Sequence, residues 1–248
     1  MPEVDNINKT GSLSKRKGAV GAIIVAAGKG SRMGLGYNKV LANLRDRPVI
    51  EWTIRKFVFS ELIDTLVLVI NPEDKEAMMR ICEPYTDKIE FIMENGGESR
   101  QDSVYNGLKV LPKEVEIVLI HDGARPFVNR DIIENSIEKA EEFGAVCVGL
   151  PAKDTIKIVD NENVVQSTPE RVLIWHAQTP QSFKKDIITK AYEHAREKGI
   201  RGTDDAGLAE WAGYKVTMFE GSSRNVKLTS AEDLILGEYF IGMSKTEF

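Results

Sequence analysis

Between residues 19 and 150, short apolar runs alternate regularly with amphipathic segments, an order that few folds can accommodate. The run from 19 to 27 is continuously apolar and rich in valine and isoleucine, as expected of a strand covered on both faces. Further runs at 65–70, 88–93, 116–122 and 145–150 predict strands, and the segments 49–59, 72–83, 99–111 and 131–143 predict helices. The alternation predicts an α/β fold, a Rossmann-like, mostly parallel sheet with helices on both faces.

The alternation stops after residue 150. The segment 155–168, TIKIVDNENVVQST, alternates apolar and polar residues around a cluster of turn formers, which predicts a protruding β-hairpin arm. A lone hairpin is marginally stable in water, so the arm should pack against either its own domain or a second subunit. After it we expect helices at 188–199, 204–213 and 231–241, and a strand at 215–221.

We therefore expect one domain over residues 19–248, with the arm at about 154–173 and a mobile polar tail over 1–18. Two helix starts have the spacing of a capping box, Asp131 with Glu134 and Thr229 with Glu232. The tail lacks the apolar core of a secretory signal. No apolar run approaches the ~20 residues that span a bilayer, so no membrane association is expected.

Charge and cysteine content restrict the function classes. The 248 residues carry a formal net charge of −5, which argues against a nucleic-acid partner. The two cysteines, Cys82 and Cys147, lie far apart in apolar surroundings and predict buried free thiols rather than a disulfide framework. A reducing, cytoplasmic location fits this content.

The first apolar run leads into a glycine-rich loop, GAIIVAAGKGSRMG, over residues 21–34. It is not a Walker A loop, because Met33 stands where the second glycine is required. It also fails as a dinucleotide fingerprint, because Met33 replaces the third glycine and the strand at 65–70 is followed by Asn71 rather than an acidic residue. The small residues still allow backbone to approach a ligand closely, and the cations Arg32 and Lys39 suit phosphate oxygens. The alternative is an ordinary glycine-rich turn with solvated cations.

Seven motifs occur in a set order along the chain: AAGKGSRMG with a following lysine, GGESRQDSV, HDGARPF, DTIK, LIWHAQTPQSF, TDDA and RNVKLT. Together they resemble the motifs of the 2-C-methyl-D-erythritol 4-phosphate cytidylyltransferases, a family of sugar nucleotidyltransferases. The resemblance spans residue 20 to the C-terminus. One departure is visible, because the family often has Pro-Lys-Gln where this chain has Asn38, Lys39 and Val40.

The resemblance implies transfer of CMP from CTP to 2-C-methyl-D-erythritol 4-phosphate, with release of pyrophosphate, on the non-mevalonate route to isoprenoids. The attacking phosphate is already anionic, so catalysis has to come from positioning and from charge stabilisation. The implied catalytic residues are Arg32, Lys39 and Lys227. Those implied to bind CTP are Ala26, Ala27, Gly28, Gly30, Gly97, Glu98, Ser103 and Gly123. We interpret Ser99 instead as a helix cap.

For the second substrate the resemblance implies binding by Asp122, Arg125, Thr155, Arg171, Thr179 and Thr203. It also implies a homodimer in which the arm carries Arg171 into the neighbouring subunit. Mg²⁺, or another divalent metal, is the expected cofactor, held mainly by the CTP phosphates without a dedicated protein ligand set. Two alternatives stay open: a cytidylyltransferase for another alditol phosphate such as ribitol 5-phosphate, and a non-catalytic nucleotide-binding module.

Overall fold

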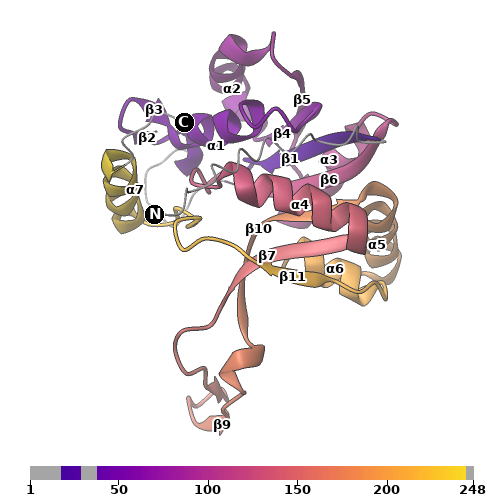
Figure 1. Cartoon of the computed structure of the whole chain (residues 1–248), viewed down its shortest axis with the longest axis vertical. Coiled ribbons are helices and arrows are strands. Elements are labelled where there is room, and N and C mark those ends of the chain that lie inside the picture. Colours follow the sequence, from indigo (N-terminus) through magenta and orange to yellow (C-terminus); the bar gives the residue numbers. More distant parts are fainter. Residues whose placement is uncertain (1–17, 29–37, 244–248) are drawn as a thin grey trace, which may run out of the picture.

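The computed structural model describes residues 18–28 and 38–243 (Figure 1). The predicted tail over 1–18 lies outside the described residues except for Gly18, and so do Gly30 and Arg32 of the glycine-rich loop. A seven-stranded sheet in the order β11-β7-β10-β6-β1-β4-β5 forms the centre. Its strands are β1 (Ala19–Val25), β4 (Thr65–Ile70), β5 (Glu90–Asn95), β6 (Val115–Asp122), β7 (Ala145–Pro151), β10 (Trp175–Lys184) and β11 (Thr217–Glu220). The predicted α/β class is confirmed.

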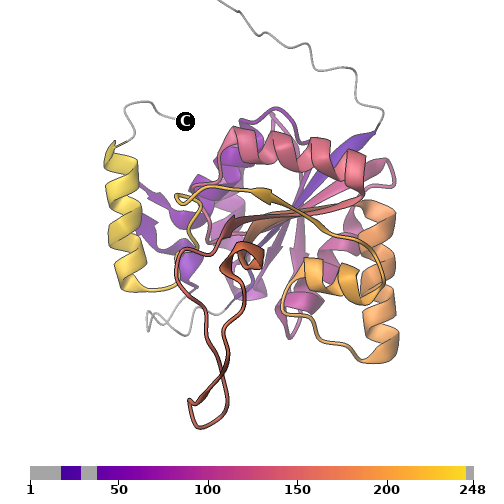
Figure 2. The same ribbon diagram turned by 60° about the horizontal axis from the view of Figure 1, so that its bottom comes forward.

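Helices cover both faces of the sheet (Figures 1 and 2). Apolar side chains of α1 (Val49–Val58), α2 (Lys75–Cys82) and α4 (Arg130–Phe143) share one core cluster with alternate residues of the strands. Those of α3 (Arg100–Val110), α5 (Lys185–Lys198) and α6 (Asp205–Trp211) share the other. In β1 the side chains of Ala22 and Ile24 belong to the first cluster and Ile23 belongs to the second, as the two-residue period of a strand requires. The strand is therefore buried on both faces, as its apolar run predicts.

Several short elements and a last helix complete the fold. Helix α7 (Ala231–Met243) stands at one side, where a third apolar cluster joins it to α1 and to the hairpin of β2 (Asn43–Leu44) and β3 (Arg47–Pro48) (Figure 2). The 3-10 turns η2 (Lys39–Leu41), η3 (Pro72–Asp74) and η4 (Glu83–Tyr85) link the larger elements.

Strand β10 is the main element that the sequence analysis did not assign. It lies between β6 and β7 and runs antiparallel to both. Its sequence, WHAQTPQSFK, looks too polar for a central strand, yet Gln178, Thr179 and Gln181 are all buried. Their polar groups have partners: the Gln181 amide donates to Asp204 and accepts from the backbone N–H of Ala206. The pairing with β7 is irregular between Ala177 and Gln181, which is where a proline can occur in a strand.

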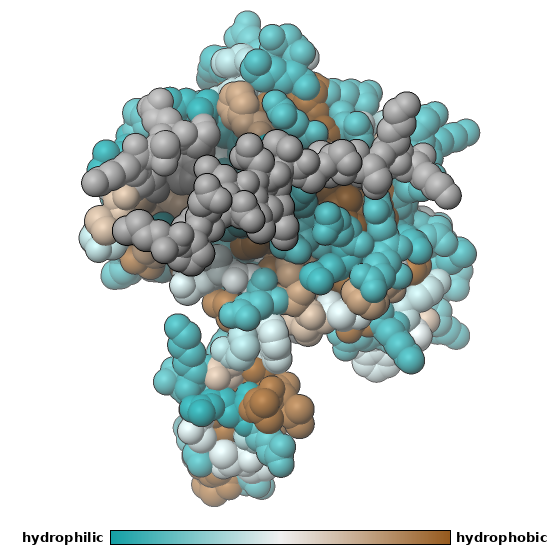
Figure 3. All heavy atoms as spheres, in the orientation of Figure 1, coloured by the Kyte–Doolittle hydropathy of each residue, from teal (hydrophilic) through white to brown (hydrophobic). Residues whose placement is uncertain are grey.

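The predicted arm is present, and it leaves the sheet between β7 and β10 (Figure 1). It contains β8 (Ile158–Val159), β9 (Val165–Ser167) and the turn η5 (Arg171–Leu173). Apolar side chains are exposed on it, and Figure 3 shows them along the right side of the arm and at its lower end. The exposed residues are Ile158, Val159, Val164, Val165, Val172 and Leu173. The arm thus does not bury this surface against its own domain.

Both predicted capping boxes are wrong in detail. The cap of helix α4 is Asn129, two residues before the predicted Asp131, because the Asn129 side chain accepts from the backbone N–H of Ile132. At α7 the reciprocal pair is Ser230 with Asp233, since the Asp233 carboxylate accepts from the Ser230 N–H and the Ser230 hydroxyl accepts from the Asp233 N–H. In each case another polar residue, one or two positions from the predicted cap, makes the capping hydrogen bond, which spacing alone does not reveal.

Candidate active site

A pocket of about 420 Å³ opens at the carboxyl ends of β1 and β6. These strands are neighbours, although the chain runs outward from β1 to β4 and β5 before it returns to β6. Ligands of open α/β sheets bind at such a reversal of strand order, because the loops that follow the two strands part there. The walls come from the loop after β1, the start of η2, the segment before α3, the end of β6 and the segment before α7.

Asn38 braces the segment that follows β1. Its buried amide donates to the Ala26 carbonyl at 2.6 Å and to Asp74 Oδ2 at 2.8 Å, and its Oδ1 accepts from the Val40 N–H at 3.3 Å. The side chain thereby caps η2 and ties it to the end of β1. Lys39 is the first residue of η2 and lines the pocket. The position at which this chain departs from the family motif is therefore an anchor for the lysine beside it.

The start of α3 forms a second wall. Ser99 caps the helix by accepting from the Asp102 N–H, which confirms its interpretation as a cap. The buried hydroxyl of Ser103 donates to the Ser99 carbonyl and accepts from the Gly97 N–H at 3.0 Å. A Cβ on Gly97 would lie 2.4 Å from that of Asp102, so only glycine fits here. Ser103 therefore shapes the backbone that faces the pocket.

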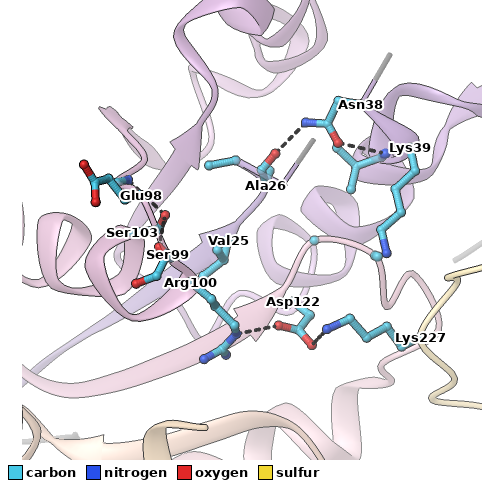
Figure 4. Close-up of a pocket in the computed structure, with 16 residues that line it drawn as sticks. Val25, Ala26, Asn38, Lys39, Glu98, Ser99, Arg100, Ser103, Asp122 and Lys227 are labelled. Carbon is cyan, nitrogen blue, oxygen red and sulfur yellow. Dashed lines mark hydrogen bonds and ion pairs between the residues drawn. The ribbon is translucent and has the colours of Figure 1, made fainter. Parts of the chain in front are cut away.

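Asp122, the last residue of β6, lies at the centre of a charge cluster (Figure 4). Arg100 and Lys227 approach its carboxylate from two sides: Arg100 Nε is 3.1 Å from Oδ1, and Lys227 Nζ is 2.8 Å from Oδ2. Arg125 Nε is 3.7 Å from Oδ2. Burial alone would raise the pKa of Asp122, but the three cations lower it well below its ordinary range. The carboxylate is thus ionised, and its charge is more than balanced.

A buried chain of hydrogen bonds supports this cluster from beneath. The Thr179 hydroxyl, on β10, accepts from the Asp122 N–H at 3.1 Å and faces His121 Nδ1 at 3.1 Å. His121 Nε2 lies 3.1 Å from the Arg125 carbonyl. Burial lowers the pKa of His121 to about 4, so the ring is neutral at physiological pH. With Nδ1 as the acceptor and Nε2–H as the donor, every group in the chain is satisfied.

The segment that carries Lys227 is fixed on both sides of the lysine. Asn225 is fully buried and donates to the Thr179 carbonyl at 2.8 Å, and its own carbonyl accepts from Arg125 at 2.7 Å. On the other side, the Leu228 N–H donates to the Ala124 carbonyl at 2.8 Å. These bonds attach the segment to β10 and to the end of β6, and they hold the Lys227 ammonium at the pocket wall.

Most of the predicted site residues come together here. Those lining the pocket are Ala26, Ala27, Gly28, Lys39, Gly97, Glu98, Ser103, Asp122, Gly123 and Lys227. Arg125 and Thr179 lie directly behind it, bonded to Asp122 or its neighbours. Gly30 and Arg32 fall outside the described residues. Their roles in binding and catalysis stay predictions.

Three predicted residues lie away from the pocket lining. Thr155 and Arg171 are exposed on the arm, where Arg171 donates to the Lys153 carbonyl at 3.0 Å. Thr203 is exposed just before α6. Within one subunit these residues do not complete the pocket.

Among the polar residues that line the pocket, two were assigned no role from the sequence: Arg100 and, apart from its place in the motif departure, Asn38. Arg100 lies within the GGESRQDSV motif, so the sequence marked its position but did not indicate its bonding partners. Those partners are distant in sequence, and no local pattern connects them. Asn38 likewise bonds to Asp74 from another loop.

The described residues contain no cluster of metal ligands and no membrane-spanning helix. Within residues 18–28 and 38–243, no three histidine, cysteine, aspartate or glutamate side chains cluster as metal ligands would. The pocket carboxylates are Glu98 and Asp122, and both oxygens of Asp122 already face cations. Every helix in the described part of the chain is too short or too polar to traverse a bilayer.

The arrangement suits a polyanionic ligand. It combines two lysines, a helix start whose backbone amides are shaped by Ser103, and close-packed small residues at the end of β1. In the described part of the pocket, no histidine or cysteine is placed to act as a base or nucleophile. Stabilisation of phosphate charge is the chemistry that this wall offers.

Comparisons with known proteins agree with one another. The family model described as 2-C-methyl-D-erythritol 4-phosphate cytidylyltransferase matches residues 20–243. A protein of that name from Clostridioides difficile is 48% identical over 226 residues, covering 91% of this chain and 94% of the relative. Another, from Caldanaerobacter subterraneus subsp. tengcongensis, is 44% identical over 223 residues, covering 90% of this chain and 98% of the relative.

Solved structures give the same result. The crystal structure of 4-diphosphocytidyl-2C-methyl-D-erythritol synthase from Anaerococcus prevotii superposes with a TM-score of 0.82 at 32% identity, over 91% of this chain and 99% of that one. The 2-C-methyl-D-erythritol 4-phosphate cytidylyltransferase of Thermus thermophilus superposes with a TM-score of 0.73 at 30% identity, over 90% of this chain and 98% of that one.

Proposed function

This chain belongs to the 2-C-methyl-D-erythritol 4-phosphate cytidylyltransferase family, and we propose that its reaction takes place in the pocket between β1 and β6. The reaction transfers CMP from CTP to 2-C-methyl-D-erythritol 4-phosphate. The products are pyrophosphate and 4-diphosphocytidyl-2-C-methyl-D-erythritol, on the non-mevalonate route to isoprenoids. The observation that carries the assignment of the site is the Lys227–Asp122 ion pair, which lines the same pocket as Lys39.

In the proposed mechanism, catalysis comes from stabilising the negative charge of the phosphates. The phosphate monoester attacks the α-phosphorus of CTP, the bond to the β-phosphate breaks, and the electron pair leaves with pyrophosphate. The attacking oxygen is already anionic, so no side chain has to remove a proton. Lys39 stabilises the triphosphate, and Lys227 faces both the α-phosphate and the incoming phosphate. We assign Arg32 to the triphosphate as well, on the basis of its motif. Such fixed cations stabilise charge that grows in the transition state.

Asp122 supports this chemistry in two ways. Its carboxylate holds the Lys227 ammonium at 2.8 Å, which fixes the position of a long and otherwise mobile side chain. Its location at the end of β6 also suits contacts to hydroxyl groups of the second substrate. Thr179 holds the backbone of Asp122 from beneath, so its assigned role in substrate binding is exerted through that residue.

Mg²⁺ is the proposed cofactor. The pocket offers few carboxylate oxygens, so the ion would be held mainly by phosphate oxygens, with Glu98 and Asp122 as the nearby carboxylates. When bound, it would neutralise part of the triphosphate charge. Lys39 and Lys227 would still be needed, because both line the pocket to which we assign the phosphates of the two substrates.

A homodimer and a cytoplasmic location are also proposed. The arm exposes apolar side chains that its own domain does not cover, and a second subunit would bury them. Thr155 and Arg171 lie on this arm, so they would reach a pocket only in the partner. Cys82 and Cys147 are buried free thiols, which suits a reducing compartment.

The test is pyrophosphate release from CTP by the purified protein with Mg²⁺ and 2-C-methyl-D-erythritol 4-phosphate. We expect turnover that requires all three. Equal turnover with ribitol 5-phosphate would favour a different alditol phosphate as the substrate, and equal turnover with UTP would contradict the base specificity. Binding of CTP without turnover with any alditol phosphate would indicate a binding module.

A further inference from the structure

Arg100 lines the pocket, yet its guanidinium is already occupied. Its two terminal nitrogens donate to the two oxygens of Asp205, at 3.0 and 2.8 Å, and its Nε donates to Asp122 Oδ1 at 3.1 Å. A bidentate pair of this kind fixes the plane of the guanidinium. The two terminal N–H groups that could donate to a phosphate are therefore directed at Asp205 instead.

Asp205 is the fixed end of this arrangement. It is the first residue of α6, its side chain is fully buried, and the Tyr192 hydroxyl donates to its Oδ1 at 2.5 Å. Tyr192 lies on α5 and is 1% exposed. A buried carboxylate is costly to maintain unless it is paired, and here both of its oxygens have partners. Asp205 is not among the residues that line the pocket.

The contacts form one continuous chain from the helical layer to the reacting wall. Tyr192 holds Asp205, Asp205 holds Arg100, Arg100 holds one oxygen of Asp122, and the other oxygen holds Lys227. Without Asp205, Arg100 would be free to fork onto both oxygens of Asp122 and to displace the ammonium of Lys227. The pair of carboxylates thus decides which cation faces the substrates.

We propose that Asp205 is a positioning residue for the transfer reaction: it engages Arg100 so that Asp122 keeps one oxygen for Lys227. The inference rests on the proposed function, since it assigns Lys227 to the reacting phosphates. Arg100 acts as a bracket between two carboxylates rather than as a phosphate ligand. The buried end of the bracket lies outside the pocket, and in this proposal its effect reaches the reacting phosphates through the Asp122–Lys227 pair.

The test is a double-mutant cycle of Asp205→Asn and Lys227→Ala in the full-length protein. Asparagine keeps the size of the side chain but presents one oxygen and one amide, so it cannot accept both Arg100 bonds. We expect Asp205→Asn to lower kcat by about 10-fold or more while the KM for CTP changes by less than about 3-fold. In the Lys227→Ala background the same substitution should cost less than about 2-fold, because the residue through which it acts is gone.

Tyr192→Phe is the second variant. It keeps the carboxylates and removes one hydrogen bond, so it should lower kcat in the same direction by about 2- to 5-fold, again only when Lys227 is present. Asp186→Asn on α5 is the matched control and should have wild-type kcat, because Asp186 is exposed and its ion pair is with the exposed Lys190. Thermal unfolding of each variant identifies any that do not fold. If Asp205→Asn does not fold, the kcat of Tyr192→Phe alone tests the proposal.

The outcomes separate the two proposals. If the fold-losses in kcat of the two single variants multiply in the double variant, the positioning role is overturned. Asp205 would then contribute to general stability and would not act through Lys227. Wild-type kcat in both Asp205→Asn and Tyr192→Phe overturns it as well. If the wild-type protein itself releases no pyrophosphate from CTP with 2-C-methyl-D-erythritol 4-phosphate, the assigned reaction fails first, and Lys227 loses the role on which the inference depends.

Discussion

The ammonium of Lys227 lies 2.8 Å from Oδ2 of Asp122, although the two residues lie far apart in the chain. Asp122 ends a central strand, and Lys227 stands in the segment that precedes the last helix. Because the side chain of Asp122 is 10% exposed and that of Lys227 is 35% exposed, the pair joins a buried anion to a cation that still reaches the pocket. The ion pair is therefore an anchor for the lysine, and its value lies in geometry more than in stability.

We expect Lys39→Ala and Lys227→Ala to lower kcat far more than they raise KM. Each lysine is assigned to charge that develops at the α-phosphorus, and removal of such a group typically costs ~10²–10³-fold in kcat. Steady-state kinetics with both substrates varied would measure the division. Lys190→Ala, at an exposed lysine on α5, is the control and should be unaffected. A near-normal kcat for Lys227→Ala would remove this residue from the mechanism.

Subunit mixing tests the placement of Arg171. If the arm reaches the partner, a mixed dimer of Lys39→Ala and Arg171→Ala has one site with both lesions and one with neither. Random exchange makes half of the dimers mixed, so activity should recover to about a quarter of wild type. The measurement is pyrophosphate release after subunit exchange, compared with each variant alone. No recovery would mean that Arg171 serves its own subunit, and a monomer in sedimentation would contradict the shared site directly.

Asn38→Ala should both destabilise the protein and weaken CTP binding. The substitution leaves the Ala26 carbonyl and Asp74 without their 2.6 and 2.8 Å donors, and it removes the cap of η2. Loss of such buried bonds costs about 1–3 kcal/mol in the free energy of unfolding. Because Lys39 starts η2, the KM for CTP should rise as well. Urea unfolding and kinetics measure the two effects; Asn135→Ala, at an exposed asparagine, should change neither.

His121 should make stability depend on pH between 7 and 5. Burial lowers its pKa from 6.5 to about 4, so in this window the unfolded chain binds a proton that the folded protein does not. The contribution to the free energy of unfolding is therefore complete above 6.5 and is lost as the pH falls, by about 2 kcal/mol at pH 5. Asp122 does not interfere, because its ordinary pKa of 3.8 and its lowered folded value both lie below the window.

Urea unfolding of wild type and of His121→Gln at pH 7 and pH 5 would measure this term. We expect the pH dependence to shrink by about 2 kcal/mol in the variant, whatever its stability at pH 7. His176→Gln controls for the loss of an exposed histidine. An unchanged pH dependence in His121→Gln would show that the buried ring titrates in the folded protein as it does in the unfolded chain.

The parts of the fold that were predictable from the sequence are those with a local signal. The strand at 19–25 and the helix at 130–143 each have a periodicity that reports their own burial, and most of the pocket follows from the rule that strand ends meet at one edge. The motif order located the lysines and the glycines of the site. These features depend on residues that are neighbours in the chain.

The rest could not be predicted because it depends on distant partners. Strand β10 is polar by composition, and its buried Gln181 is acceptable because its amide bonds to Asp204 and to the N–H of Ala206, which come from a later segment. Arg100 and Asp205 are 105 residues apart, and neither residue type predicts the other. Pairings of this kind appear only when the topology is known, since each residue alone is consistent with a solvated position.

The position of β10 has a consequence for the order in which the protein can be built. Its neighbours β6 and β7 leave the ribosome first, yet neither can complete its hydrogen-bond ladder until residues 175–184 have been synthesised and have passed between them. A nascent chain that ends within the arm therefore displays β6 with one unpaired edge and β7 with both edges unpaired, because β11 also follows the arm in the chain. Ribosome stalling or premature termination in that interval would release a chain prone to aggregation, whereas the same event after residue 184 would leave the centre of the sheet closed.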